Sequence, residues 1–383
     1  MTEEELIKSL PEPVKENAQR LLRMKPEELP EHPEKNKWYY YSPKGCICSN
    51  GFPYYSSLKL GTENNLIVLF CGGGCALDAY SAARPNTYFP QEGKSQFYFA
   101  DTFIAGYLLA HTGIADKDRD DNPFRNWSVV VIAYGSGDFH CGTNDFAYDD
   151  PEMGAGICHH HGYNNYRAMV EKIKEYVPNP GKLLVTGFSA GGFGTAILTD
   201  DVMSLFPNCK DVTCIEDSGV FSYGGWYETA KAQWGTPKEI LARIHSDNIV
   251  LDCLLALHRK YGKKVKIAFG CTYRDALLSQ CEGYTHGQGG LIFSRENGDI
   301  FEQTLARFVK TLKDEIPDVA LYIFDKPSPE KNVSEKDNLT DHTFITSPDV
   351  FDYSYGGVKL IDWITNTVNG KPMQVGLELL GVK

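Results

Sequence analysis

The chain of 383 residues is long enough for one large α/β domain or two smaller ones. Its composition, 42% hydrophobic and 23% charged, is that of an ordinary globular protein, and no stretch is apolar for long enough to span a membrane. The net charge of -12 argues against nucleic acid and against an anionic membrane surface as partners.

The N-terminal region differs in composition from the rest of the chain. It is acidic and polar and lacks the basic, then apolar leader of a secreted protein. We therefore expect a cytoplasmic protein if the chain is complete, and a secreted one if a leader has been removed. Prolines divide the region into short helical segments, and a connector rich in Pro and Glu follows. This pattern predicts a helical appendage over residues 1–35 and a single α/β domain over residues 36–383.

The eleven cysteines are spread along the chain and show no spacing typical of a structural zinc site. They fit either a reduced cytoplasmic chain or a secreted chain with several disulfides. Cys209 and Cys214 flank a turn and are candidates to pair with each other.

Apolar runs typical of strands alternate with helical patterns from residue 38 onward. An opening hairpin is expected from residues 38–41 and 54–55. Buried parallel strands are predicted at 66–71, 129–133, 183–185, 212–215, 265–270 and 319–324. Helices are predicted at 163–177, 196–205, 240–257, 301–316 and 358–368. The alternation predicts an α/β fold with a mainly parallel sheet and helices on both faces.

A serine lies between two glycines where one predicted strand meets a helix. The segment Gly187–Gly191 has the pattern G-x-S-x-G with Ser189 at its centre. At such a turn small neighbours let strand and helix approach closely, and the hydroxyl is exposed at the helix N-terminus, where developing negative charge is favoured. The alternative is a tight connection without chemistry, but the flanking strand and helix favour a nucleophile elbow.

A serine nucleophile needs a base and a group that orients the base. In α/β hydrolases the chain order is nucleophile, acid, base, each in a loop after a strand. Asp275 follows the strand at 265–270, and His342 follows the last predicted strand. We therefore expect Asp275 to be the acid and His342 the general base. The rival acids are Asp217, Asp325, Asp337 and Asp341.

Backbone N–H groups are the expected donors to an oxyanion. One would come from Ala190, directly after the serine, and others from the run Gly72–Gly74 after an early strand. The run is not a phosphate-binding loop because no Gly-Lys-Ser/Thr follows.

Three consecutive histidines, His159–His161, raise the question of a metal site. Successive histidines rarely face one ion, and no partner ligand is spaced to complete a site, so we predict no metal. Asp138 and His140 are expected to line the pocket or to brace loops.

Together these motifs resemble those of the pectin acetylesterase and Notum family. The resemblance covers the glycine run, the segments 134–142 and 160–165, and the segment 187–194 around Ser189. It implies an α/β-hydrolase-like fold and a Ser-Asp-His triad that cleaves carboxylic esters. It also implies Ser189 as nucleophile, Asp275 as acid, His342 as base, and Gly73, Gly74 and Ala190 as the oxyanion region. Cys75 and Ala76 depart from the residues that often follow the glycines in the family, and they lie near the acyl pocket.

The sequence thus predicts a serine carboxylesterase that acts through an acyl-enzyme and needs no cofactor. The expected substrate is a small-molecule or saccharide ester. Its acyl group is expected to be short, with acetyl as the first choice. The alternatives are a longer-chain, lipase-like deacylase and a catalytically inactive hydrolase fold that binds a ligand. The oligomeric state is left open.

Overall fold

The computed structural model describes residues 23–86, 95–102 and 111–382, together with residues 5, 7, 8, 15, 16 and 19. Sixteen of the 35 residues expected to form the helical appendage therefore lie outside the described residues. At its end, β1 (Glu27–Glu28) pairs in parallel with β2 (Trp38–Tyr41). The boundary at residue 36 stays a prediction.

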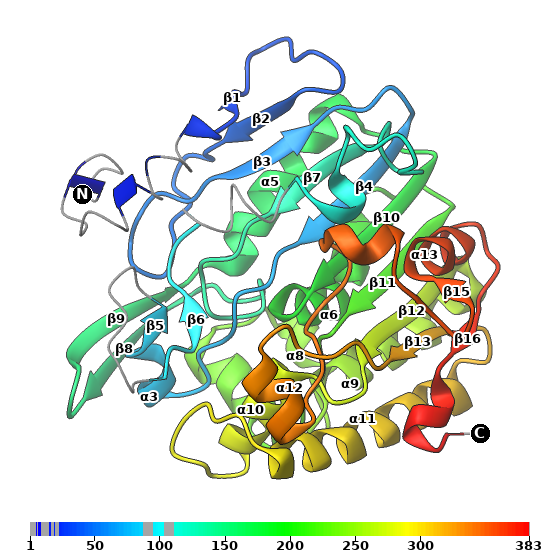
Figure 1. Cartoon of the computed structure of the whole chain (residues 1–383). Helices are drawn as coiled ribbons and strands as arrows, with labels where there is room; N and C mark the ends of the chain where they lie inside the picture. The colour runs from blue at the N-terminus through cyan, green and yellow to red at the C-terminus, as the bar shows by residue number, and fades with distance from the viewer. Residues whose placement is uncertain are drawn as a thin grey trace.

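Within the described residues, ten strands form one sheet in the order β1-β2-β3-β7-β4-β10-β11-β12-β13-β16 (Figure 1). Only β3 pairs antiparallel, with β2 and β7, so the sheet is mainly parallel as predicted. The remaining bounds are β3 Ser56–Lys59, β4 Asn65–Phe70, β7 Ser128–Ile132, β10 Lys182–Phe188, β11 Val212–Asp217, β12 Val265–Thr272, β13 Ala320–Phe324 and β16 Gln374–Val375.

The central strands are buried along their whole length, which is why they read as continuous apolar runs in the sequence. The expected strand at 54–55 is instead β3, which starts at Ser56. The Ser56 hydroxyl donates to the Val131 carbonyl at 2.8 Å, so a polar residue is satisfied inside the sheet. This polar start hides the strand from a search for apolar runs.

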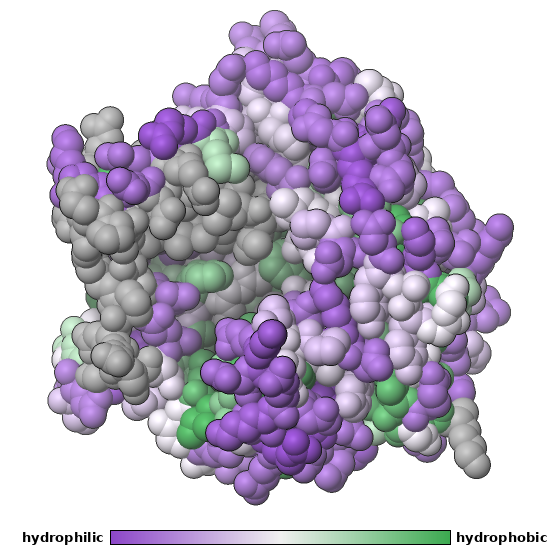
Figure 2. Space-filling model, viewed as in Figure 1, coloured by the Kyte–Doolittle hydropathy of each residue, from purple (hydrophilic) through white to green (hydrophobic). Residues whose placement is uncertain are grey.

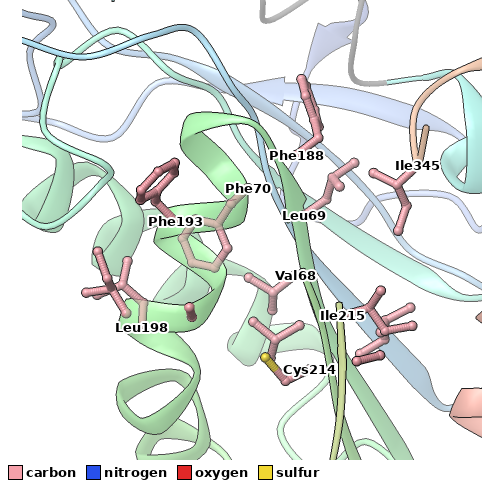
Figure 3. Close-up of a cluster of buried hydrophobic side chains, with 14 of the residues drawn as sticks. Val68, Leu69, Phe70, Phe188, Phe193, Leu198, Cys214, Ile215 and Ile345 are labelled. Carbon is pink, nitrogen blue, oxygen red and sulfur yellow. The ribbon is translucent and has the colours of Figure 1, made fainter. Parts of the chain in front are cut away.

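Helices cover both faces of the sheet. On one face lie α5 (Gly162–Tyr176), α6 (Ala190–Leu205), α9 (Ile249–Tyr261) and α11 (Arg295–Glu315), and on the other lies α13 (Leu360–Val368). Figure 3 shows the alternation that separates the faces: Phe70 points toward Phe193 and Leu198 of α6, whereas Leu69 points to the opposite side with Ile215 and Ile345. This period of two gives each face its own apolar layer.

Four predicted helices differ from the structure by more than one residue. α6 and α11 each begin six residues before the predicted starts at 196 and 301. The stretch 240–257 is α8 (Lys238–Leu241) and α9, with a break between them, and residues 358–359 form β15 (Val358–Lys359), which pairs with β14 (Ser354–Tyr355), before α13 begins. The smaller elements are α3 Ala79–Ala82, β5 Pro85–Asn86, β6 Tyr98–Phe99, β8 Asn144–Asp150, β9 Gly154–His160, α7 Trp226–Glu228, α10 Ala276–Thr285 and α12 Lys331–Asp337.

All eleven cysteines lie among the described residues, and all are free thiols. The possible Cys209–Cys214 disulfide is therefore not formed. Cys214 points between β11 and α6, where Thr199 donates to its sulfur at 3.4 Å, and Cys209 lies in the preceding loop. Among the described helices, none combines the length and the hydrophobicity needed to cross a bilayer.

Candidate active site

The candidate site lies where the sheet order reverses direction. The chain runs from β4 outward to β7 and then returns to β10 on the other side of β4, so β4 and β10 flank a switch point. Ligand sites in open α/β sheets form at the carboxyl ends of strands at such points, because the connecting loops diverge there. Gly72–Gly74 follow β4 and Ser189 follows β10.

Ser189 occupies a strained turn between β10 and α6. Its φ of 56° and ψ of -128° are sparsely populated for a residue with a side chain. The turn is possible only with glycines beside it: a Cβ on Gly191 would lie 2.0 Å from the Phe70 carbonyl oxygen, and one on Gly187 would lie 2.5 Å from the Phe70 carbonyl oxygen. The predicted strand–turn–helix context of the serine is confirmed.

Asp275 and His342 are joined by a hydrogen bond. The Nδ1–H of His342 donates to Asp275 Oδ2 at 2.7 Å. Asp275 is fully buried, and its Oδ1 accepts the amides of Leu277 and Leu278 at the start of α10. A backbone bridge between Asp275 and Thr340 holds the two loops side by side. The carboxylate is therefore fixed by three donors, and it fixes the imidazole in turn.

The imidazole of His342 is held through Nδ1, which leaves its other nitrogen, Nε2, available as an acceptor. Because Nδ1 donates to the carboxylate, Nε2 is the acceptor nitrogen of the neutral ring. It is buried and has no hydrogen-bond partner within the described residues. Burial lowers the pKa of His342, but the attraction and hydrogen bond of Asp275 outweigh it, so the pKa lies above 6.5. The ring is poised to accept a proton at Nε2.

The rival carboxylates have other partners. Asp341 accepts the backbone amide of His342 at 2.9 Å and pairs with Lys326, Asp325 accepts the hydroxyl of Tyr353, and Asp337 ends α12. None of these three is bonded to the His342 ring within the described residues.

Asp217, the fourth rival, holds the histidine loop by its backbone. Its Oδ2 accepts the amides of Phe344 and Ile345, each at 2.8 Å, two and three residues after His342. Burial raises the pKa of Asp217 to about 7, and the two amide bonds oppose that rise. The sequence placed Asp217 among candidate acids, but the contact that defines its position spans 127 residues and has no local signal.

A cleft of about 340 Å³ opens beside Ser189 and His342. Figure 2 shows a hollow with hydrophobic side chains on this face, between β6 and α12 of Figure 1. Apolar side chains dominate its lining: Phe97, Phe99, Phe188, Leu277, Leu278 and Leu291. The sequence analysis missed these residues because they come from four separate segments.

Two of the three expected oxyanion residues line the same cleft. Gly73 and Gly74 are part of its lining, and Ala190 is the first residue of α6 directly after Ser189. Bulk is excluded here: a Cβ on Gly72 would lie 2.6 Å from the Cβ of Ser189, and one on Gly74 would lie 1.9 Å from the Phe97 carbonyl oxygen. Backbone amides can therefore approach a group bound at Ser189 more closely than any side chain would allow.

Asp138 and His140 brace loops and do not line the cleft. Asp138 is fully buried and accepts the Ser136 hydroxyl and the amides of His140, Gly142 and Gly162. His140 Nε2 donates to the Cys71 carbonyl at 2.9 Å, and burial lowers its pKa to about 4, so the ring is neutral. This bond supports the strand end that leads into Gly72.

The sheet order, the strained serine turn and the later acid and histidine define the chain as an α/β hydrolase. The sequence model of the pectinacetylesterase family matches residues 41–233, and the chain belongs to that family. The matched region contains Ser189 and the glycine run. Asp275 and His342 lie beyond it, so their pairing rests on the structure.

Two curated relatives and one solved structure show how similar this chain is to known proteins. Pectin acetylesterase 5 and pectin acetylesterase 4 of Arabidopsis thaliana are each 24% identical, over 184 and 182 residues. Each match covers 46% of this chain but only 40% and 41% of the relatives' lengths. The Wnt deacylase Notum from Drosophila superposes with a TM-score of 0.58 over 88% of this chain and 95% of its own, at 14% identity. At that identity the likeness concerns the fold.

Proposed function

We propose that this protein is a serine carboxylesterase that hydrolyses short acyl esters, with O-acetylated carbohydrate as the preferred substrate class. The observation that carries the proposal is the 2.7 Å bond from His342 to Asp275, which leaves Nε2 free in the cleft that Ser189 also lines. The family's name, pectinacetylesterase, supports the substrate class.

In the proposed reaction, His342 Nε2 takes the proton of Ser189 as the serine oxygen attacks the ester carbonyl. The amides of Gly73, Gly74 and Ala190 stabilise the oxyanion, and His342 then protonates the departing alcohol. Water, deprotonated by the same histidine, attacks the acyl-enzyme and releases the carboxylic acid. Besides the ester and water, these steps use only groups of this chain, so the proposal includes no cofactor.

A longer-chain deacylase is the second candidate. The apolar lining of the cleft, which includes Phe97, Phe99 and Leu277, favours it because such a surface accommodates an alkyl chain as well as a methyl group. The two candidates share the proposed nucleophile and differ in the acyl group that the cleft accepts.

The test is hydrolysis of p-nitrophenyl esters from acetate to palmitate by the wild type, Ser189→Ala and the control Ser204→Ala, which alters an exposed serine on the same helix. We expect Ser189→Ala to lose activity and Ser204→Ala to keep it, with the highest rate on acetate. A peak at longer chains would select the deacylase. Equal rates for Ser189→Ala and the wild type would reject both and leave a ligand-binding hydrolase fold.

If acetate is preferred, the substrate class is tested by acetate release from acetylated pectin, acetylated xylan and their deacetylated controls. Release from one of the acetylated polymers by the wild type and not by Ser189→Ala is the expected result. Activity on p-nitrophenyl acetate without release from either polymer would contradict the carbohydrate assignment.

A further inference from the structure

A second cluster of chemically active side chains lies on the β8–β9 hairpin, which extends at the left edge of Figure 1. Within His159–His161 the side chains alternate. His160 is buried, and its Nδ1 donates to the Ser136 carbonyl at 2.8 Å. Because neighbouring residues of a strand point to opposite sides, this inward anchor turns His159 and His161 outward together.

The antiparallel partner strand supplies a carboxylate to the same place. Asp145 is the register partner of His159, and its Oδ1 lies 2.6 Å from His159 Nδ1 and 2.9 Å from His161 Nε2. The three candidate ligand atoms all lie within 4.8 Å of one another. Two imidazole nitrogens and one carboxylate oxygen thus converge on one point.

Two features of the sequence argued against a metal site here: the three histidines are consecutive, and no further ligand lies nearby in the chain. The structure removes both objections. Successive histidines do not share a face, but the first and third do. A partner ligand was missing from the local sequence, but hairpin pairing brings in Asp145 from 14 residues away. The objections therefore no longer apply to His159 and His161 as a pair.

We propose that Asp145, His159 and His161 bind one divalent transition-metal ion of the zinc type. Two neutral imidazoles and a carboxylate are ligands that Zn²⁺ prefers, and a water molecule would complete four-coordination. Metal–ligand distances near 2.0–2.2 Å place tetrahedral ligand atoms roughly 3.3 Å apart, so the hydrogen-bonded atoms need to separate by less than about 1 Å. Asp145 is exposed enough to make that adjustment.

The position of the site indicates a stabilising role. His159 is the penultimate residue of β9, whereas His161 immediately precedes α5, and Asp145 lies on β8. A bound ion would therefore link the hairpin to the start of a helix that packs on the sheet. None of the three residues lines the cleft at Ser189, so the ion is expected to raise stability and to leave ester hydrolysis unchanged.

The test is competition for Zn²⁺ between the full chain and a chromophoric chelator. The variants are Asp145→Asn and His161→Ala, and the control is His245→Ala, which removes an exposed histidine outside the cluster. We expect one equivalent bound by the wild type and the control, and an affinity at least about tenfold weaker in both cluster variants, since even loss of an outer-shell partner costs 10–100-fold. Wild-type affinity in Asp145→Asn and His161→Ala, or no saturable binding by the wild type, would overturn the proposal.

A second readout begins with the wild type alone. For the wild type, Tm measured with Zn²⁺ should exceed Tm measured with a chelator. A tetrahedral site should also give the intense visible absorption of bound Co²⁺, and this band should be absent from Asp145→Asn. An unchanged Tm together with no Co²⁺ band would mean that the three side chains serve only as a hydrogen-bonded cluster.

Discussion

At the scale of single residues, the candidate site depends on opposing effects at His342. Burial favours the neutral ring, whereas the Asp275 carboxylate favours the protonated ring. The net effect raises the pKa of His342 from its ordinary value. The buried His140, which lacks a bonded carboxylate on its ring, has a pKa lowered to about 4.

The pH dependence of ester hydrolysis follows from this balance. A general base must be neutral, so kcat/KM should fall as the pH drops through the pKa of His342, and the midpoint of the acid limb should lie above 6.5. The measurement is kcat/KM for p-nitrophenyl acetate from pH 5 to 9. A limb centred well below 6.5 would contradict the role assigned to the Asp275 contact.

Asp275→Asn tests the contact between Asp275 and His342 directly. The amide keeps the shape of the side chain but removes the charge that favours the protonated ring and the required tautomer. We expect kcat to fall by about 10⁴-fold, as for the equivalent change in other triads. Asp325→Asn, which alters a rival carboxylate bonded to Tyr353, is the control and should retain activity. Equal losses in the two variants would refute the choice of Asp275.

At the scale of elements, the serine turn and the histidine loop are each positioned by close backbone contacts. The turn between β10 and α6 approaches the end of β4 so closely that Gly191 has no room for a side chain. The histidine loop is attached to β11 by the two amides that Asp217 accepts, and to the loop after β12 by the bridge between Asp275 and Thr340. Neighbouring strand ends therefore determine the distance between nucleophile and base.

Gly191→Ala tests the first contact. Its Cβ would lie 2.0 Å from the Phe70 carbonyl oxygen, so the turn or the strand end must shift. We expect a loss of stability of about 1–3 kcal/mol together with a loss of esterase activity. Gly224→Ala is the matched control, because a Cβ there meets nothing within 4 Å. Urea unfolding and kcat should both be unchanged in the control, and a neutral Gly191→Ala would contradict the packing argument.

Asp217→Ala tests the second contact. Two buried amides lose their acceptor, at about 1–3 kcal/mol each, and the loop that carries His342 loses its attachment. We expect kcat to fall by up to about 10²-fold with a smaller change in KM, since small displacements of catalytic groups have effects of that size. Asp217→Asn keeps an acceptor oxygen and should recover most of the rate. A drop in Tm alone, with kcat unchanged for the folded Asp217→Ala protein, would limit Asp217 to a structural role.

At the scale of the whole molecule, one large apolar cluster covers both faces of the sheet, with smaller clusters beside it, and all the cysteines are free thiols. Ten of the eleven cysteines are buried and Cys281 is partly buried, with burial raising its pKa to about 12. Stability therefore comes from apolar packing across both faces of the sheet, without the disulfides that the sequence left possible.

A thiol titration tests this arrangement. Tm should be the same with and without a reducing agent, and a thiol reagent should modify the native protein slowly but count eleven thiols after unfolding. Removing native disulfides from a chain that relies on them costs about 2–5 kcal/mol. A marked fall of Tm on reduction would therefore show that the protein in solution contains bridges.

The sequence by itself determined the parts of this protein that depend on local pattern. Buried strands appeared as apolar runs because their environment is apolar on both faces, and the serine turn appeared because its glycines adjoin it in the chain. The α/β class followed from these patterns, and their order in the chain selected Ser189, Asp275 and His342 as candidate catalytic residues. The β8–β9 hairpin was missed because its strands, NDFAYDD and GAGICHH, are partly exposed and show neither a continuous apolar run nor a regular alternation of polar and apolar residues.

Only the tertiary structure decided which residues meet. Asp275 and Asp217 both follow buried strands, but strand pairing brings the first to the His342 ring and the second to the amides beyond it. His159 and His161 gained a carboxylate through hairpin register, which local spacing does not encode. The physical reason is the same in each case: contacts between residues far apart in sequence form only when the sheet and its packed layers close the distance between them.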